Sequence, residues 1–593
     1  MIPAQLPDSL RILVNLRQLD EAGFVRLMVA RRINSRGVND LLDLAELLTD
    51  PQQVQLALSR LDWLTLRGLH TSDREALNAA SQLQLATSEA EPKLYASAAA
   101  RLQQMLPQLP DFTAAANTDR TGSEPAHRIS TLAADAIDLL DAAPRTVRGG
   151  RGGVRMSGVE VRRIATELDI DAAVAGALYR WLFTADQIAP AGDTWLPTAL
   201  GRGFAAKSLA DRWRILALAW IGDLNAPALL ELCELLGMPA PLHGVNDFDG
   251  AAPTTAAVNL PSNLAARQLA AEALGVLHRT NTDEGKPGEP VPGSFSLTSA
   301  GALLLNGEFD AAAALLAAAF PAEVDRVYIQ PDRTIIAPGP LRPDVEVRLR
   351  QVADLSRRAI ASEYRVDDAS LSRALSSGLA EDQIREFLSE VSLTGIPQPI
   401  DYLIRDSAER FGRVRVRETA TGTLVRAVDT AVADALLVDA ALRPLGLRPV
   451  AAGLVSSVSA PAVLQTLLEC RYPAVAEDEN GRPLVAAQKP CAEPYVQAPT
   501  ASVQSTAEAL AQLAAESSTT DDHYTWLQRR LELARRSRQP LEVAVDIGGG
   551  KSRTLLLVPI AVGAQRLRAL DLDADVERTL PLRSIAEVTD ASD

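Results

Sequence analysis

Three glycines followed by lysine and serine lie within the stretch VAVDIGGGKSRTLLLVP at Val543–Pro559, and they form the most chemically suggestive motif of the chain. A loop of this composition can hold phosphates when it joins a strand to a helix, because backbone N–H groups and the lysine then converge on the anion. The phosphate-binding pattern requires a first glycine at position 545, where this chain has Val545. The residues after Ser552 are rich in leucine, reach a proline and show no helical period. The sequence therefore predicts a β-hairpin with a glycine turn, and no ATPase or helicase motor.

Arginine alternates with valine at residues 413–417, which is a second pattern that could do chemistry. Arg413, Arg415 and Arg417 would project from one face of a strand, and Arg405 and Arg410 precede them on a predicted helix. Guanidinium groups along one face can follow a phosphate backbone, and each contact adds salt-sensitive affinity for DNA. The alternative is a solvated strand face whose charges are neutralised by the neighbouring carboxylates Asp406, Glu409 and Glu418. The sequence leaves both interpretations open.

Further arginines gather in a glycine-rich segment upstream, namely Arg145, Arg148, Arg151, Arg155, Arg162 and Arg163. Within this segment only Glu160 carries the opposite charge. The composition predicts a flexible arm beside a helical unit, and such an arm could contact the minor groove or the phosphates of DNA. A disordered, solvated linker is the alternative.

The histidines and cysteines do not form a metal-binding pattern. The five histidines are scattered without a partner at ligand spacing, and Cys233, Cys470 and Cys491 are too far apart for a zinc ribbon or a disulfide framework. No Ser/His/Asp arrangement stands out. We therefore expect no catalytic residue, no metal and no cofactor, with the cysteines reduced in a cytosol.

Composition limits the classes of protein that remain. The chain has 593 residues, which predicts about three to five domains. Apolar residues make up 47% and aromatic residues only 4%, so alanine and leucine must pack the cores, which favours helices. The net charge of −16 means that any DNA contact must come from a local basic face. No long uncharged apolar run or cleavable leader is visible, so we expect a cytoplasmic protein without a membrane partner.

The N-terminal half is predicted to be mainly helical. Residues 1–110 show amphipathic stretches joined at Thr49-Asp50-Pro51, typical of either a helix-turn-helix or a plain bundle. Residues 111–157 are poor in large apolar residues, apart from a short helical stretch near Leu132–Leu140, and predict a linker that carries the arginine arm. In residues 158–323 the pattern of helix, turn, helix and β-hairpin occurs twice, and WLPTALG (Trp195–Gly201) resembles FSLTSAG (Phe295–Gly301). This predicts tandem winged-helix-like units.

The C-terminal half mixes strands and helices. Residues 324–476 predict a mixed αβ domain, residues 477–520 a second linker, and residues 521–593 a helix followed by a small β-rich module. The expected fold class is therefore α+β and multidomain.

Two stretches of the middle domain resemble a known family. YIQPDRTIIAPGPL at Tyr328–Leu341 and the run from Leu371 to Val416 are similar to the N-terminal domain of XPB-type DNA helicases, which also occurs in stand-alone bacterial proteins called helicase-associated. The similar stretch covers about Val324–Ala476. The resemblance implies engagement of distorted DNA. No helicase motor follows this stretch, so unwinding activity is not implied.

The C-terminal residues resemble a second family. LEVAVDIGGGKSRTLLLVPIAV and LRALDLDADVERTLPLRSIAEV are similar to WYL-type domains, which are small Sm-like β modules of bacterial regulators. The Trp-Tyr-Leu triplet is absent, and QRLRAL stands in its place. The resemblance implies ligand binding by the residues that match the family's basic positions, Arg578 and Arg583.

Three hypotheses follow for function. The first is a non-enzymatic, DNA-associated accessory protein in DNA repair or transcription, acting beside a separate XPB-type helicase or another repair or transcription protein. The second is a WYL-type regulator that senses a ligand or nucleic acid. The third is a protein-interaction scaffold, which the acidic net charge favours.

Overall fold

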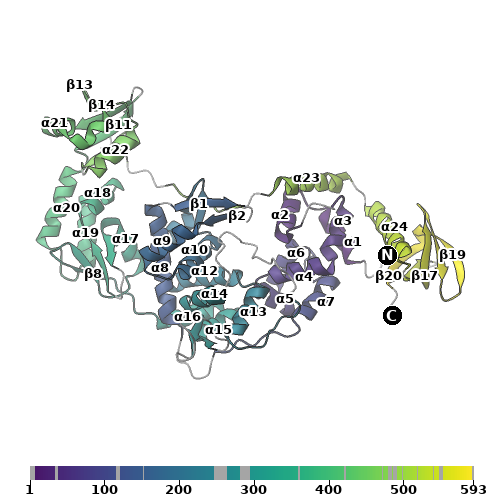
Figure 1. Ribbon diagram of the computed structural model, residues 1–593. Coiled ribbons are helices and arrows are strands. Elements are labelled where there is room, and N and C mark those ends of the chain that lie inside the picture. Colours follow the sequence, from purple (N-terminus) through teal and green to yellow (C-terminus); the bar gives the residue numbers. More distant parts are fainter. Residues whose placement is uncertain are drawn as a thin grey trace.

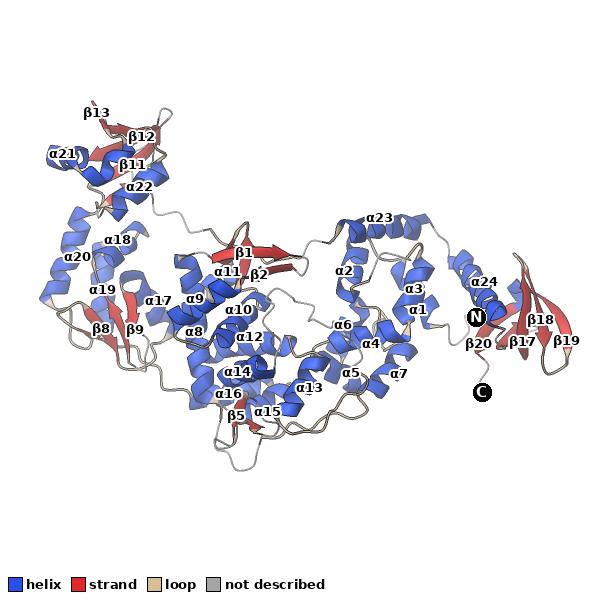
Figure 2. Ribbon diagram, viewed as in Figure 1, coloured by secondary structure: helices blue, strands red, loops and turns tan. Residues whose placement is uncertain are grey.

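The computed structural model describes residues 7–33, 38–114, 121–143, 145–150, 153–245, 264–280, 294–357, 361–419, 422–470, 472–478, 484, 490–496, 499–516, 519–538, 540–546 and 552–590. Helices dominate the N-terminal half, and the strands gather in several small sheets (Figure 1, Figure 2). This confirms the expected α+β class. No described helix combines the length and the apolar character that a membrane span requires.

The N-terminal part consists of short helices that pack on one another, namely α1 (Asp8–Leu16), α2 (Glu21–Arg31), α3 (Leu41–Thr49), α4 (Pro51–Arg60), α5 (Trp63–Thr71), α6 (Arg74–Gln82) and α7 (Ala96–Met105). Asp50 accepts hydrogen bonds from the backbone N–H groups of Gln52 and Gln53, and Pro51 opens α4. The joint predicted between α3 and α4 is confirmed, because a side-chain cap and a proline both favour a helix start.

Helix α8 (Ser123–Ala142) lies inside the segment 111–157 that the sequence predicts to be a linker. Ala126, Ala133 and Ala136 are fully buried along it, and α8 packs against α12 (Leu209–Gly222). The helical stretch expected near Leu132–Leu140 is present, but the helix begins at Ser123 and is packed, so the linker prediction is wrong for α8. Ile129, Ile137 and Leu140 are buried beside the alanines, which let the neighbouring helices approach closely.

The predicted arginine arm is a β-hairpin. Strand β1 (Arg145–Gly150) pairs antiparallel with β2 (Gly153–Met156), and β1 also pairs with β4 (Thr194–Pro197), so the sheet has the order β2-β1-β4-β3, with β3 at Ile188–Ala191. Glycine-rich composition suggested flexibility, but ladder hydrogen bonds to a neighbouring strand hold this segment.

A helix, turn, helix and hairpin occur in both places that the sequence predicts. The first copy contains α9 (Gly158–Leu168), α10 (Ala172–Thr184), β3, β4 and α11 (Ala199–Arg202), followed by the short helix η1 (Phe204–Ala206). The second contains α12, α13 (Ala226–Leu235), α14 (Leu264–Ala273), β5 (Leu277–Arg279), β6 (Phe295–Leu297), α15 (Ser299–Leu305) and α16 (Phe309–Ala319).

The two copies share one joint. Thr198 caps α11 and its hydroxyl donates to the carbonyl of Asp186; Thr298 caps α15 and donates to the carbonyl of Gly275. Asp186 and Gly275 both have positive φ, 55° and 77°. The likeness between WLPTALG and FSLTSAG therefore reflects the same hydrogen bonds.

A third copy lies in the N-terminal helices, where the sequence alone did not show it. Gln84 has φ of 54°, Ala86 bridges to Leu94, and the Tyr95 N–H donates to the Leu85 carbonyl. Thr198 and Thr298 make the same backbone bond to Gln187 and Val276. The helix pair of this copy is α5 and α6, so the joint at Asp50 is not the turn of a repeated unit.

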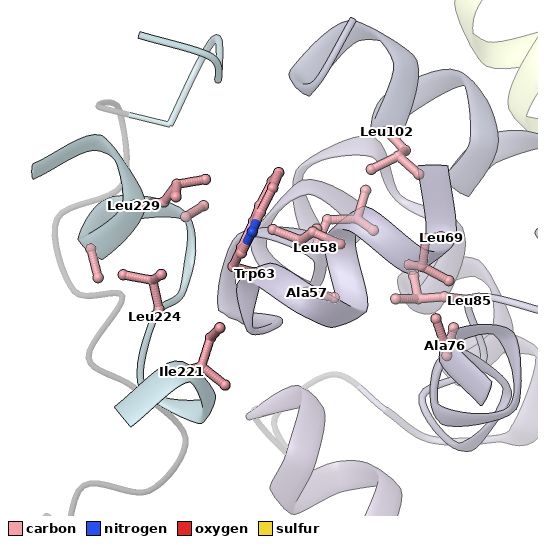
Figure 3. Close-up of a cluster of buried hydrophobic side chains, with 14 of the residues drawn as sticks. Ala57, Leu58, Trp63, Leu69, Ala76, Leu85, Leu102, Ile221, Leu224 and Leu229 are labelled. Carbon is pink, nitrogen blue, oxygen red and sulfur yellow. The ribbon is translucent and has the colours of Figure 1, made fainter. Parts of the chain in front are cut away.

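The second and third copies pack on each other around Trp63 (Figure 3). The Trp63 indole N–H donates to the carbonyl of Leu305 at 2.7 Å, and its backbone N–H donates to Leu224 at 2.8 Å. Ile221, Leu224 and Leu229 face the ring from the other side of this contact. Burial of a tryptophan with its N–H satisfied makes this a firm junction.

The middle region contains two separate cores. The first is built from β7 (Tyr328–Ile329), β8 (Thr334–Ala337), α17 (Pro343–Val352), β9 (Asp354–Arg357), β10 (Ser362–Arg365), α18 (Asp368–Ser376), α19 (Glu381–Val391) and α20 (Gln398–Arg410). The second begins at Val414. Both lie within the segment 324–476 that the sequence predicts to be one αβ domain.

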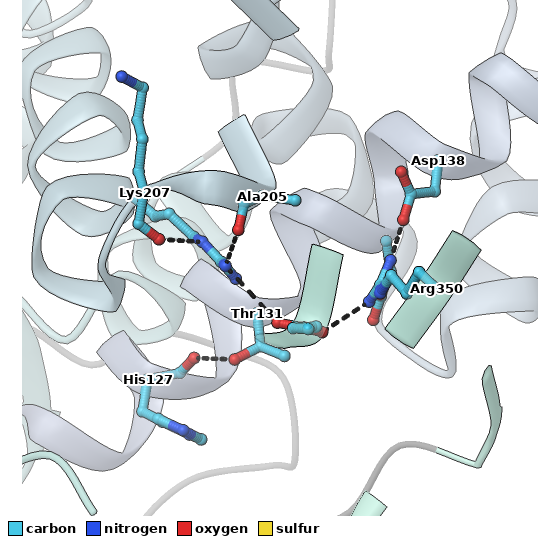
Figure 4. Close-up of polar contacts among 9 residues, drawn as sticks. His127, Thr131, Asp138, Ala205, Lys207 and Arg350 are labelled. Atoms are coloured by element: carbon cyan, nitrogen blue, oxygen red, sulfur yellow. Dashed lines mark hydrogen bonds and ion pairs between the residues drawn. The ribbon is translucent and has the colours of Figure 1, made fainter. Parts of the chain in front are cut away.

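Helix α17 is tied to the helical body by buried charges (Figure 4). Arg350 pairs with Asp135 at 2.7 Å, with Asp138, and with Glu346 at 3.0 Å. Arg212 of α12 lies 3.6 Å from Glu346 and donates to the Lys207 carbonyl. Because these charges come from both sides, they hold α17 against α8 and α12.

The C-terminal part begins with α23 (Ala501–Glu516), which lies across α2 and α3 and buries Ala507 and Leu510 (Figure 1). This stretch of the predicted linker 477–520 is therefore packed, again through alanine and leucine. Helix α24 (Thr519–Ser537) then precedes the strands β16 (Leu541–Asp546), β17 (Ser552–Val562), β18 (Arg566–Asp571), β19 (Val576–Pro581) and β20 (Ile585–Asp590), which form a sheet of order β19-β18-β17-β16-β20.

Strands β16 and β17 pair antiparallel from Leu541↔Leu557 to Asp546↔Ser552. The hairpin predicted at this place is confirmed, although Gly548–Gly550 lie outside the described residues. A strand after Ser552 cannot supply the helix N-terminus on which a phosphate loop depends.

Candidate nucleic-acid interface

The arginines predicted at residues 413–417 lie on a five-stranded sheet. Its strands are β11 (Val414–Thr419), β12 (Gly422–Ala427), β13 (Arg448–Val450), β14 (Gly453–Ser456) and β15 (Ala474–Ala476), in the order β13-β14-β12-β11-β15. Helices α21 (Thr430–Val438) and α22 (Ala460–Glu469) cover one face, where Val414, Val416, Val425 and Leu454 are buried. The alternation along β11 therefore directs valine toward the helices and arginine away from them.

The strand register adds two arginines to this second face. Arg415 lies opposite Arg426 on β12, and Arg417 lies opposite Leu424. The row that starts at Arg417 continues through Val455 to Arg448 on the edge strand β13. Arg413 immediately precedes β11. We call this surface the open face; its arginines are Arg413, Arg415, Arg417, Arg426 and Arg448.

Two carboxylates pair with three of these arginines. Arg413 contacts Asp429 at 2.7 Å, and Glu477 contacts Arg426 and lies 3.9 Å from Arg417. The Glu477 side chain is fully buried, whereas Arg413 and Arg426 are about 40% exposed. Hydrogen bonds from the Val432 backbone and from Arg413 lower the pKa of Asp429. In the described ion pairs, the carboxylates that contact these arginines are therefore Asp429 and Glu477, which follow β11 in the sequence. Glu409 and Glu418, which the sequence suggested, do not occur in these pairs.

Arg405 and Arg410 belong to helix α20 and not to the open face. Each pairs with an aspartate four residues earlier, Asp401 or Asp406, and Arg410 also lies 3.4 Å from Asp368. The sequence suggested Asp406 as a partner of the strand arginines, but Asp406 pairs with Arg410 on helix α20. Such i,i+4 pairs stabilise an exposed helix by only about 0.3–0.5 kcal/mol.

The second arginine cluster is divided by burial. Arg145 is buried and pairs with Glu167 at 2.6 Å and Glu160 at 3.9 Å, so its assignment as a DNA contact is wrong. Arg163 is exposed and pairs with the same Glu167, and Arg162 is exposed. Arg148 and Arg155 are register partners on β1 and β2, but their side chains, like all of Arg151, lie outside the described residues.

Arg578 is held inside its own hairpin. Its Nε donates to Asp571 at 2.6 Å, and this bond lowers the pKa of the Asp571 carboxyl. The same carboxylate accepts from the N–H groups of Asp573 and Ala574 in the turn. Arg583 is exposed in the short helix η3 (Leu582–Ser584). Arg578 thus locks a turn, and the structure does not bring it together with Arg583 through any described contact.

Arg426 and Arg448 are the residues that sequence reasoning missed. A signal existed for Arg426, because the antiparallel pairing of GRVRVRE with GTLVRAV places it opposite Arg415. No pattern in the sequence indicates that Arg448 belongs to the open face. Arg448 lies there because β14 pairs with β12 and β13 pairs with β14. Among the described residues, no group of three or more His, Cys, Asp or Glu side chains could hold a metal ion.

One family model matches the chain. Residues 327–451 match the helicase conserved C-terminal domain. The match contains β7 to β13 and therefore three of the five strands of the arginine sheet, β11, β12 and β13, but it covers well under half of the chain. It gives the middle region a helicase-related character. The finer resemblances, to the N-terminal domain of XPB-type helicases and to WYL-type domains, stay predictions. A search of curated proteins finds no match to this sequence.

Proposed function

We propose that this chain is a non-enzymatic, DNA-associated accessory protein that acts beside a separate helicase in DNA repair or transcription. The observation that carries the proposal is the helicase-related match at residues 327–451, which includes the arginine strand β11. The repeated helix, turn, helix and hairpin units support it. If they are winged helices, their second helices α6, α10 and α14 are suited to the major groove of DNA.

Absence of a motor is part of the proposal. It is supported by Val545 in place of the first glycine and by the β16–β17 hairpin, which puts a strand where a phosphate loop needs a helix. The purified protein should therefore show no ATP hydrolysis above background, with or without DNA. DNA-stimulated hydrolysis that disappears in Lys551→Ala would contradict this part.

The DNA-binding part is tested with the full chain and a labelled short duplex or single strand at two salt concentrations. We expect binding that weakens as salt rises, because a protein of net charge −16 must rely on a few close phosphate contacts. The helicase part is tested by adding an XPB-type helicase, whose unwinding rate should increase. No binding to either DNA, together with no effect on unwinding, would refute the proposal.

A protein-interaction scaffold is the second candidate, and the ion pairs favour it. Arg413, Arg417, Arg405 and Arg410 all contact carboxylates of the same chain, which reduces the charge available to DNA. A scaffold would bind the helicase equally well with and without DNA. The C-terminal module, a helix followed by five antiparallel strands, is compatible with the proposed Sm-like, WYL-type assignment, and ligand sensing there remains a separate proposal.

A further inference from the structure

The open face of the β11–β15 sheet combines arginine with aliphatic side chains. Moving across the sheet from β15, one row holds Val475, Arg415 and Arg426, and the next holds Arg417, Leu424, Val455 and Arg448. Glu477 directly follows β15. The apolar positions are valine and leucine, and no aromatic residue occurs in either row. Proteins that bind single strands without sequence preference use aromatic rings on which bases stack. The two rows of the open face therefore carry positively charged side chains but no aromatic ring on which a base could stack.

The arginines lie on strands at both sides of the sheet. Arg417 and Arg448 are in one row, separated by β12 and β14. Three interstrand steps of about 4.8 Å put their backbones about 14 Å apart. This separation is close to the width of about 12 Å of the major groove of B-DNA, which phosphates border on both sides. Arginines at these positions can reach the two backbones of one duplex.

We propose that the open face binds the phosphate backbone of duplex DNA without reading its bases, with Arg426 and Arg448 among the contacts. This inference rests on the proposed function and names its ligand and two of its residues. Glu477, buried beneath Arg426, neutralises part of the face, so the number of phosphate contacts is small and the affinity depends strongly on salt.

The experiment compares the full chain with Arg426→Ala/Arg448→Ala in fluorescence titrations of a mixed-sequence duplex over a salt series. Each lost contact should reduce the slope of log K against log salt by about 0.9, so the double variant should lose about 1.8. A second duplex of unrelated sequence should lose affinity by the same factor, because phosphate contacts carry no base information. Arg357→Ala/Arg373→Ala removes two exposed arginines of the same region that lie off this sheet, and its slope should stay unchanged.

Removing Arg426 leaves Glu477 buried without its closest partner, so that variant can lose its fold for reasons unrelated to DNA. Arg448→Ala, on an exposed edge strand, avoids this and should reduce the slope by about 0.9. An unchanged slope in a folded Arg448→Ala protein, with wild-type binding intact, would overturn the inference and leave the proposed function standing. Tighter binding of oligo(dT) than of the duplex would overturn the duplex assignment. No binding of the duplex by the wild type would also overturn the inference. It would refute the proposed function itself only if oligo(dT) is not bound either and unwinding by the helicase is unaffected.

Discussion

At the scale of single residues, burial separates the arginines that support the fold from those that can meet a ligand. Arg145 opens β1 with its side chain 5% exposed between Glu160 and Glu167, while Arg163 on α9 shares Glu167 but is 62% exposed. An isolated buried charge is costly, so the carboxylates are needed for Arg145 to be tolerated at all. Arg163 is solvated, so its ion pair with Glu167 is not needed for the charge to be tolerated.

Arg145→Ala should therefore destabilise the protein by about 3 kcal/mol, because Glu160 then loses the cation beside it and Glu167 retains only the exposed Arg163. Arg163→Ala should cost less than about 1 kcal/mol. Scanning calorimetry of both variants measures the shift of the unfolding transition. Equal shifts would show that burial does not determine the role of Arg145. If Arg145→Ala changed the slope of log K against log salt for DNA binding, Arg145 would be a DNA contact after all.

The pair of Asp571 and Arg578 predicts a pH dependence. The pKa of Asp571 is lowered in the folded protein because Arg578 donates to it, so the unfolded chain binds the proton more tightly. The stabilisation is therefore full above the unfolded pKa of about 4 and is lost as pH falls through the lower folded value. The difference in melting temperature between wild type and Arg578→Ala should be constant above about pH 5 and shrink below about pH 4.

The control for this titration is Arg566→Ala at the start of β18, the strand that ends at Asp571, and this variant should show no such change with pH. A wild-type to Arg578→Ala difference that persists at the acid end would mean that packing, and not the charged pair, provides the stabilisation.

At the scale of elements, one joint recurs after each hairpin. The strand is followed directly by Thr198 or Thr298, whose hydroxyl both donates to a carbonyl in the preceding turn and accepts from the N–H of Gly201 or Gly301. The glycine is required because a Cβ at position 301 would lie 2.3 Å from the Val276 carbonyl oxygen. The joint therefore sets the distance between hairpin and helix.

Gly301→Ala should destabilise by about 1–3 kcal/mol, the usual cost of forcing extra volume into a packed site. Gly222→Ala is the matched control, since Gly222 is the exposed last residue of α12 and nothing lies within 4 Å of the added Cβ. Alanine should stabilise that helix by up to about 1 kcal/mol. Calorimetry of the two variants should thus give shifts of opposite sign; shifts of the same sign would argue against a close-packed joint.

At the scale of the whole molecule, ion pairs connect parts that are distant in the sequence. Arg350 ties α17 to Asp135 and Asp138 of α8, and Arg529 of α24 contacts Asp40 and Asp43 at the start of α3. The helicase-related region and the C-terminal module are both fastened to the helical body through arginine. Their orientation should therefore depend on these residues.

Arg350→Ala should loosen the contact of α17 with α8, because Asp135 is only 12% exposed and loses its cation. We expect a larger radius of gyration in small-angle X-ray scattering, with unchanged helix content by circular dichroism. Arg348→Ala, on the same helix but paired with Glu390 of its own region, should leave the radius unchanged. An unaltered radius in Arg350→Ala would show that apolar packing alone holds α17.

The sequence by itself determined features that depend on near neighbours: the cap at Asp50, the alternation of valine and arginine along β11, the likeness of Thr198 and Thr298, and the hairpin after Val543. Only the tertiary structure decided which arginines are buried, that α8 and α23 pack against other helices, and that Arg448 joins Arg417 on one face. Caps, turns and strand periodicity are set by local backbone hydrogen bonds and side-chain direction. Burial and ion-pair partners depend instead on which elements meet, because register across a sheet and contact between helices link residues that spacing along the chain does not relate.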